Sequence, residues 1–163
     1  MSARSRRCHA LNRRAAEAVT VREAVTELLT ARGAGGAGDG AGNLNDEPDA
    51  PTTQILHGPP GSEIGTGRFG RLDQGDGQRL WNLATHIPQG QRCSRLHRGR
   101  PEPMDHILAS HAMVGLVPGG VVTTDGAGPV PSITDDPSER RDAAESDHRP
   151  VIAAVVAMPS TVR

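Results

Sequence analysis

Apolar residues recur at helical spacing near the start of the chain. The set comprises Leu11, Ala15, Ala18, Val21, Val25, Leu28 and Leu29. Steps of three and four residues bring side chains onto one face of an α-helix. Asn12 suits an N-cap and Gly33 suits the residue after the last turn. The pattern therefore predicts a helix over residues 13–32.

The next segment contrasts with this helix. Residues 33–42 form the run GAGGAGDGAG, which has no β-branched or large side chain. Such a composition is typical of a flexible linker. Residues 43–79 contain much Gly and Pro and few apolar residues, and they predict a long, loosely ordered loop.

Short apolar runs in the second half predict strands. The run 104–110, MDHILAS, predicts one strand, and 114–117 and 121–124 are further strand candidates. Residues 150–157, PVIAAVVA, are continuously apolar. The length of that last run suits a strand that is buried on both faces.

Composition limits the hydrophobic core. Leu, Ile, Val and Phe supply 30 of the 163 residues, and the chain has one Phe, one Trp and no Tyr. That share is below the roughly 20% that marks many disordered chains, but the net charge of −1 lacks the excess that usually accompanies disorder. We expect one folded domain with a poorly filled core.

Charge and residue spacing disfavour several classes of function. All 18 basic residues are Arg and are balanced by 19 acidic residues, which argues against a general nucleic-acid-binding protein. Cys93 and His97 have no second pair of ligands to complete a zinc site. Gly65, Gly67 and Gly70 match G-x-G-x-x-G, but no predicted strand precedes them, so a dinucleotide site is not expected. No membrane span or signal peptide is visible, which makes the cytoplasm the default expectation.

Three short motifs follow one another along the chain. They are GNLNDEP at 42–48, MDHILAS at 104–110 and SDHRPV at 146–151. The stretch 79–100, with WNL and RGR within it, separates the first motif from the second. In this order and near this spacing, the motifs resemble those of the endonuclease/exonuclease/phosphatase superfamily, in a bacterial branch of actinobacterial type.

The resemblance implies a fold and a division of the chain. It covers roughly residues 12–157 and only the C-terminal half of the family domain. The implied fold class is α/β, as part of a four-layer α-β-β-α sandwich. Residues 1–11 would then be a basic leader and residues 158–163 a tail.

The resemblance also implies roles for five residues. His148 would contact the scissile phosphate and assist attack by water, and Asp105 would accept a hydrogen bond from His148 and fix its tautomer. Asn45 would orient water or donate to a phosphate oxygen, and Asn43 stands where the family has Asp. Asp147 would be a carboxylate on the side of a Mg²⁺ or Mn²⁺ ion, since such hard cations prefer oxygen ligands.

Elementary chemistry supports the pairing of Asp105 with His148. A carboxylate at the start of an apolar strand needs a partner, and His148 is the candidate. His106 would point to the opposite face of the same strand and is expected to be structural. Taken singly, Asp147 and His148 could be ordinary loop residues, and Asn45 could form an Asx turn.

Two departures from the family pattern bear on activity. Asn43 cannot act as a base or supply negative charge to a metal, and the family's N-terminal half, with its metal-binding Glu, has no counterpart here. We expect a metal-dependent phosphoesterase that binds Mg²⁺ weakly, or else a truncated, non-catalytic remnant or a fragment that needs a partner half. The class of phosphoester stays open, and nucleic acid is expected only as a substrate.

Overall fold

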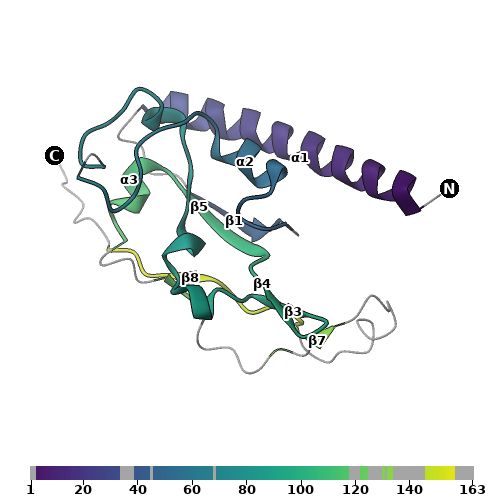
Figure 1. Ribbon diagram of the computed structural model, residues 1–163. Helices are drawn as coiled ribbons and strands as arrows, with labels where there is room; N and C mark the ends of the chain where they lie inside the picture. The colour runs from purple at the N-terminus through teal and green to yellow at the C-terminus, as the bar shows by residue number, and fades with distance from the viewer. Residues whose placement is uncertain are drawn as a thin grey trace.

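The N-terminal helix is longer than its apolar pattern predicts. The computed structural model describes residues 3–33, 39–44, 46–67, 69–117, 122–124, 130, 132–133 and 146–156. Helix α1 (Ala3–Arg32) begins well before Arg13 and extends past the rest of the molecule at its N-terminal end (Figure 1). Residues 3–12 contain neither Gly nor Pro, so nothing in them interrupts a helix. The helix ends as predicted at Gly33, whose φ of 72° belongs to the left-handed region.

A second helix, α2 (Pro51–His57), interrupts the predicted loop, so that prediction is wrong here. Helix α1 lies against it through Arg22, whose Nη1 donates to the carbonyl oxygens of Leu56 at 3.1 Å and His57 at 3.4 Å. Gly58 follows with φ of 78°, and a Cβ there would lie 2.5 Å from the Arg22 guanidinium carbon. The left-handed φ favours glycine here, and a larger residue would displace the end of the Arg22 side chain.

The buried carboxylate of Asp76 stabilises the loop that follows α2. Asp76, in the short 3₁₀ helix η1 (Asp76–Gln78), is 1% exposed. It accepts hydrogen bonds from the Ser62 amide at 2.7 Å, the Ser62 hydroxyl at 2.6 Å and the Asp73 amide at 2.8 Å. Burial alone would raise the pKa of Asp76, but these hydrogen bonds outweigh it and hold the pKa below its ordinary value.

The central sheet has three antiparallel strands in the order β1-β5-β2. Strand β1 (Asp39–Asn43) and strand β2 (Trp81–Asn82) flank β5 (Asp105–Ala109). The linker prediction is therefore wrong for residues 39–43, which form a strand paired with β5. The register sets Asn43 opposite Asp105 and Asp39 opposite Ala109.

Strand β5 has two differently covered faces, because successive side chains alternate. Leu108 packs with Ala18 and Leu29 of α1 and with Leu56 of α2, so the helices cover this face. Ala109 lies in a second cluster, on the other face. That cluster comprises Trp81, Leu83, Ala84, Ile87, Ala109, Val114 and Val122.

The remaining elements are short. They are η2 (Leu83–His86), η3 (Gln89–Gln91), β3 (Arg95–His97), β4 (Arg100–Glu102), α3 (His111–Val114), β6 (Val122–Thr123), β7 (Ser132–Ile133) and β8 (Ile152–Ala153). Strand β3 pairs antiparallel with β4 and parallel with β7, and β6 pairs antiparallel with β8. The strands predicted at 104–110 and 121–124 are confirmed over 105–109 and 122–123.

Two strand predictions are wrong. Residues 111–114 form helix α3 and a turn follows, so 114–117 is no strand. Among its described residues, 150–156, the last run contributes only β8, and Ile152, Val155 and Val156 are 47%, 47% and 53% exposed. This run is therefore not buried on both faces.

The described residues show helices and small sheets, which confirms a mixed α/β protein. The four-layer sandwich stays a prediction. In the described ranges, no helix has both the length and the apolar character that crossing a membrane requires.

Candidate functional site

Ser94 joins the three segments that build the site. Its hydroxyl oxygen accepts from the amides of Met104 at 2.9 Å and Asp105 at 3.1 Å, at the start of β5. Its carbonyl accepts from the Arg149 amide at 2.6 Å. Ser94 is 1% exposed. Residues at 94, 104–105 and 149, distant in sequence, are thus fixed at one point.

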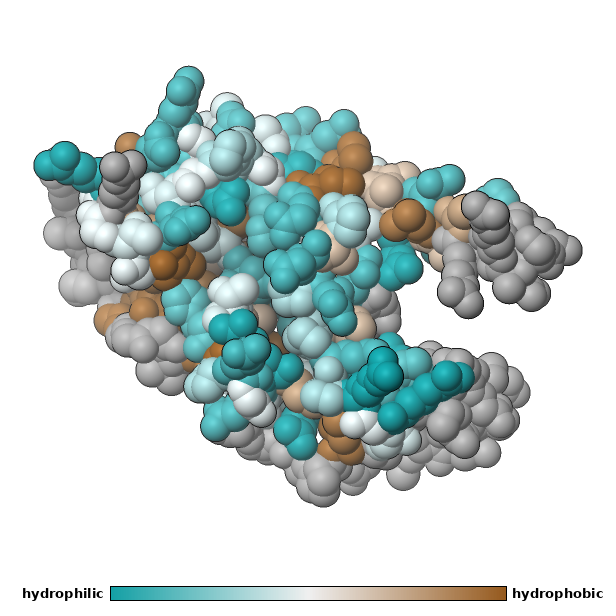
Figure 2. Space-filling view, in the orientation of Figure 1, coloured by the Kyte–Doolittle hydropathy of each residue, from teal (hydrophilic) through white to brown (hydrophobic). Residues whose placement is uncertain are grey.

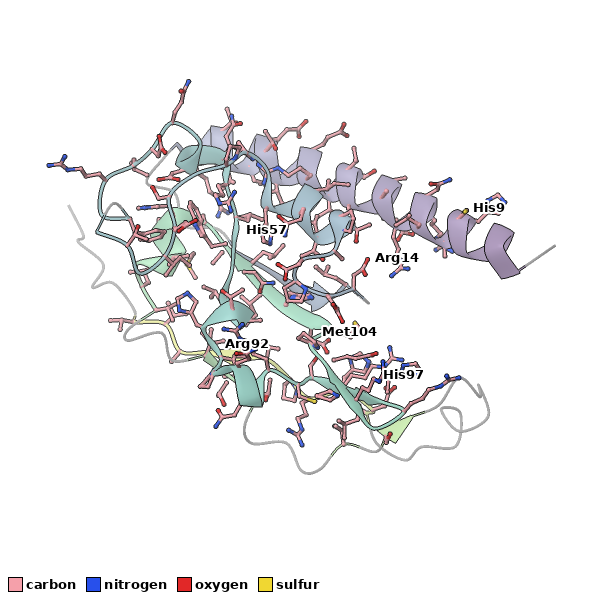
Figure 3. The ribbon with its side chains drawn as sticks, viewed as in Figure 1. His9, Arg14, His57, Arg92, His97 and Met104 are labelled. Atoms are coloured by element: carbon pink, nitrogen blue, oxygen red, sulfur yellow. The ribbon has the colours of Figure 1, made fainter. Side chains whose placement is uncertain are left out.

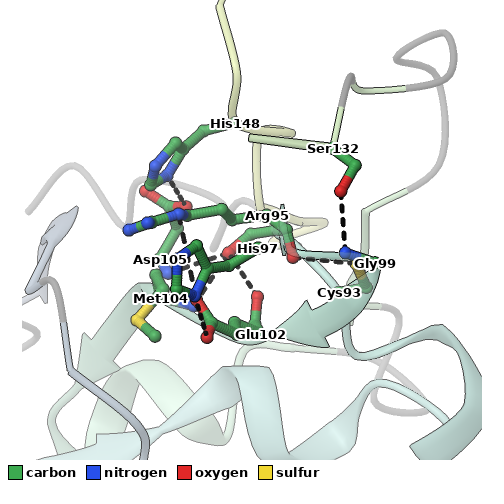
Figure 4. Close-up of polar contacts among 10 residues, drawn as sticks. Cys93, Arg95, His97, Gly99, Glu102, Met104, Asp105, Ser132 and His148 are labelled. Atoms are coloured by element: carbon green, nitrogen blue, oxygen red, sulfur yellow. Dashed lines mark hydrogen bonds and ion pairs between the residues drawn. The ribbon is translucent and has the colours of Figure 1, made fainter. Parts of the chain in front are cut away.

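This junction brings the predicted pair together. His148 Nδ1 lies 2.7 Å from Asp105 Oδ2, which confirms the predicted hydrogen bond between these two side chains (Figure 4). An ionised carboxylate only accepts, so Nδ1 carries the proton and Nε2 is left with its lone pair in the neutral ring. Neither the His148 side chain, 16% exposed, nor that of Asp105, 19% exposed, is closed off from solvent.

The other predicted residues stand differently. Asn43 is opposite Asp105 in the β1–β5 register, so its backbone lies beside the pair. Asn45 lies outside the described residues. Asp147 precedes His148 and is partly exposed. The structure therefore places Asp105, His148 and the backbone of Asn43 together.

His106 occupies the opposite face of β5, where a structural role was predicted. It is 2% exposed. Asn82 Oδ1 accepts from the Ala84 amide at 3.0 Å, which turns Asn82 Nδ2 toward His106 Nδ1 at 2.8 Å. His106 Nε2 lies 2.9 Å from the Asp46 carbonyl oxygen. Burial lowers the pKa of His106, partly offset by this hydrogen bond and by the charges of Asp105 and Asp46.

The structure adds Arg95 and Glu102, two residues that the sequence did not single out. Arg95 and His148 are directly opposite in an antiparallel bridge, and Arg95 is likewise opposite Glu102 in β4. Arg95 Nε lies 3.8 Å from Glu102 Oε2, and His97 Nδ1 lies 3.3 Å from Glu102 Oε1. The alternation Arg95-Leu96-His97 places Arg95 and His97 on one face of β3, but it does not connect either residue to the predicted pair.

A divalent cation needs several oxygen ligands in one place. Among the described residues, no three His, Cys, Asp or Glu side chains lie together in a way that could hold a metal ion. The described residues therefore do not fit a complete Mg²⁺ site. His9, another side chain of a type that can bind metals, is at the N-terminal end of α1 and lies well apart from Met104 and His97 (Figure 3).

Comparisons with known proteins add no assignment. No protein-family model, no curated protein and no solved structure matches the chain. The functional argument consequently rests on the motifs and on the geometry of the described residues.

Proposed function

We propose that this chain supplies the histidine–aspartate part of a phosphoesterase site of the endonuclease/exonuclease/phosphatase type. The observation that supports the proposal is the 2.7 Å contact between His148 Nδ1 and Asp105 Oδ2. The motifs led us to expect this contact between residues that are 43 positions apart. The two side chains come from different segments, so sequence proximity alone does not explain their meeting.

The pair has the chemistry that phosphoester hydrolysis needs. Asp105 holds the Nδ1 proton of His148, which leaves Nε2 to accept a proton from an attacking water. Once protonated, the same atom donates to a phosphate oxygen. A positioned acid or base of this kind contributes roughly 10² to 10⁴-fold to a rate.

The proposal includes a Mg²⁺ or Mn²⁺ ion because the family resemblance implies one. Bound, such an ion would neutralise charge on the phosphate. Because the described residues do not complete its site, the ion would need further ligands, and we derive no step through it. We expect weak binding by this chain, since affinity follows the number and charge of the ligands.

Exposed apolar residues favour the second candidate, a fragment that acts only with a partner half. Leu11, Val19, Val21 and Leu28 of α1 are 47%, 44%, 52% and 56% exposed. Figure 2 shows apolar patches among the polar surface along this helix. Among the described residues, strand β1 is also an edge of the central sheet, and an edge strand can accept another strand.

The test measures Mg²⁺-supported hydrolysis of bis(p-nitrophenyl) phosphate. It compares the chain and its His148→Ala variant, each with and without a family N-terminal half supplied in trans. We expect near-background turnover by the chain alone, and turnover with the added half that falls at least about 100-fold in His148→Ala. Arg13→Ala, on the exposed side of α1, is the charge control. Absence of His148-dependent turnover in every arm would overturn the proposal.

A further inference from the structure

Three charged or ionisable side chains form a row across neighbouring segments. Glu102 of β4 is opposite Arg95 of β3, and Arg95 is opposite His148. Directly opposite residues of antiparallel segments place their side chains on the same face, with Cβ atoms about 5 Å apart. Arg95 therefore lies between Glu102 and the His148–Asp105 pair, as Figure 4 shows.

The guanidinium of Arg95 has unused hydrogen-bonding capacity. Its side chain is only 12% exposed, and Nε is buried without a hydrogen-bond partner among the described residues. Glu102 Oε2, at 3.8 Å, is an ion-pair partner beyond hydrogen-bonding distance. Buried polar groups are normally hydrogen-bonded, and an exception calls for an explanation such as a missing ion or ligand.

Glu102 holds the position of Arg95 without using up its donors. Its other oxygen, Oε1, faces His97 Nδ1 at 3.3 Å. The carboxylate is thus shared between two cationic or potentially cationic side chains. This arrangement fixes the Arg95 side chain beside His148, with Nε buried, and leaves the terminal Nη groups to contact an anion.

We propose that Arg95 binds a phosphoryl oxygen of the substrate beside His148, with Glu102 as its positioning residue. The inference rests on the proposed function and names a substrate-binding residue of the same site. The planar guanidinium fork matches the oxygens of a phosphate, which an ammonium group contacts only as a point charge. Arg95 would hold the phosphoryl group while His148 Nε2 exchanges the proton.

The rival explanation is that Arg95 serves only the fold, through its ion pair with Glu102. The two explanations differ in their prediction for anion binding. A purely structural Arg95 would affect the melting of the protein but not phosphate affinity in the folded protein. A phosphate-binding Arg95 would affect affinity even in a variant that folds normally.

The experiment is a titration of the full chain with inorganic phosphate at constant ionic strength, followed by NMR of the His148 ring signals. Signals are assigned by their loss in His148→Gln. We expect Arg95→Ala to weaken phosphate binding about tenfold or more, the effect of losing a charge-assisted hydrogen bond. Arg95→Lys keeps the charge and should lose part of the affinity. Arg13→Ala, whose side chain is 82% exposed on α1, removes the same charge elsewhere and should change affinity less than about twofold.

Each result decides the inference. Phosphate binding at His148 that is equally strong in both Arg95 variants would overturn it while leaving the proposed function standing. Phosphate that does not perturb His148 in the unsubstituted chain would also overturn it. If Arg95→Ala fails to fold, Arg95→Lys decides by the same criterion. Arg95-dependent binding without hydrolysis in any arm of the activity test would support the phosphate site and refute the esterase.

Discussion

A histidine lies on each face of strand β5, His106 on one and His148 on the other. The two imidazole rings differ in how many of their nitrogens are hydrogen-bonded. His106 has both ring nitrogens occupied, by Asn82 at 2.8 Å and by the Asp46 carbonyl at 2.9 Å, and it is 2% exposed. His148 has Nδ1 on Asp105 at 2.7 Å, and Nε2 has no hydrogen-bond partner among the described residues. Its side chain is 16% exposed.

This difference separates a structural histidine from one that can do chemistry. A ring with both nitrogens satisfied and buried has no atom to offer a substrate. A ring held at one nitrogen is oriented and still has a free acceptor, which is the arrangement that a general base requires. The partners also differ, because an amide donates to His106 Nδ1 whereas a carboxylate accepts from His148 Nδ1.

The largest expected effect is on stability. His106→Ala removes a buried side chain and takes away the hydrogen-bond partner of Asn82 Nδ2 and that of the Asp46 carbonyl. We expect the free energy of unfolding to fall by about 3 kcal/mol. His148→Ala, at a partly exposed position, should cost about 1 kcal/mol or less. Urea denaturation of both variants measures the difference, and equal losses would erase the distinction between the two faces.

The second effect is a pH dependence of stability. The folded-state pKa of His106 is lowered by burial, and those of His57 and His86 are lowered in the same direction. Below the unfolded value of about 6.5, the unfolded chain binds more protons than the folded one, so stability is lost as pH falls toward the folded pKa. His106→Gln should reduce the slope between about pH 7 and 5. Identical slopes with and without the substitution would contradict the assignment.

The third prediction is that Asn82→Asp makes the hydrogen bonding of His106 resemble that of His148, whose Nδ1 faces a carboxylate. In Asn82→Asp, the carboxylate can still accept from the Ala84 amide, but it can no longer donate to His106 Nδ1. Both ring nitrogens of His106 would then need protons. We expect the pKa of His106 to rise above that in the unsubstituted chain, because the new carboxylate stabilises the imidazolium. An NMR titration that shows the pKa unchanged would refute the hydrogen-bond directions given for this face.

The smallest expected effect is a loss of stability on substitution of Asn43 in strand β1, which lies beside the Asp105–His148 pair. Asn43→Asp would set a second carboxylate opposite Asp105 in the register. Like charges directly opposite one another are unfavourable, so we expect a loss of roughly 0.5 kcal/mol at pH 7. The loss should shrink in about 1 M salt, which screens interactions between partly exposed charges. Asn43→Ala, compared by urea denaturation at low and high salt, controls for loss of the amide, and a penalty that salt leaves unchanged would exclude charge repulsion.

Some features could be predicted because they depend on local pattern or on a resemblance. The strand at 105–109 follows from its apolar run, and the structural role of His106 follows from alternation along that strand. The contact between Asp105 and His148 came from the motifs together with the need of a half-buried carboxylate for a partner. No pattern in the spacing alone would have joined these two positions.

Other features depend on tertiary contacts that the pattern does not contain. Strand β1, rich in glycine, has no side-chain signal, and it exists because β5 offers backbone partners. The apolar run after Pro150 suggests burial, yet Val155 and Val156 lie exposed. Arg95 could not be identified as part of the site, because its position depends on a bridge to His148 that only the fold creates.

The most direct test of the account is the tautomer of each histidine, read from long-range ¹⁵N–¹H correlations of the imidazole rings in their neutral forms. The account predicts that His148 carries its proton on Nδ1 and His106 carries its proton on Nε2. A His148 ring protonated on Nε2 would leave no free acceptor on the proposed substrate side. That result would contradict both the pairing with Asp105 and the role proposed for His148.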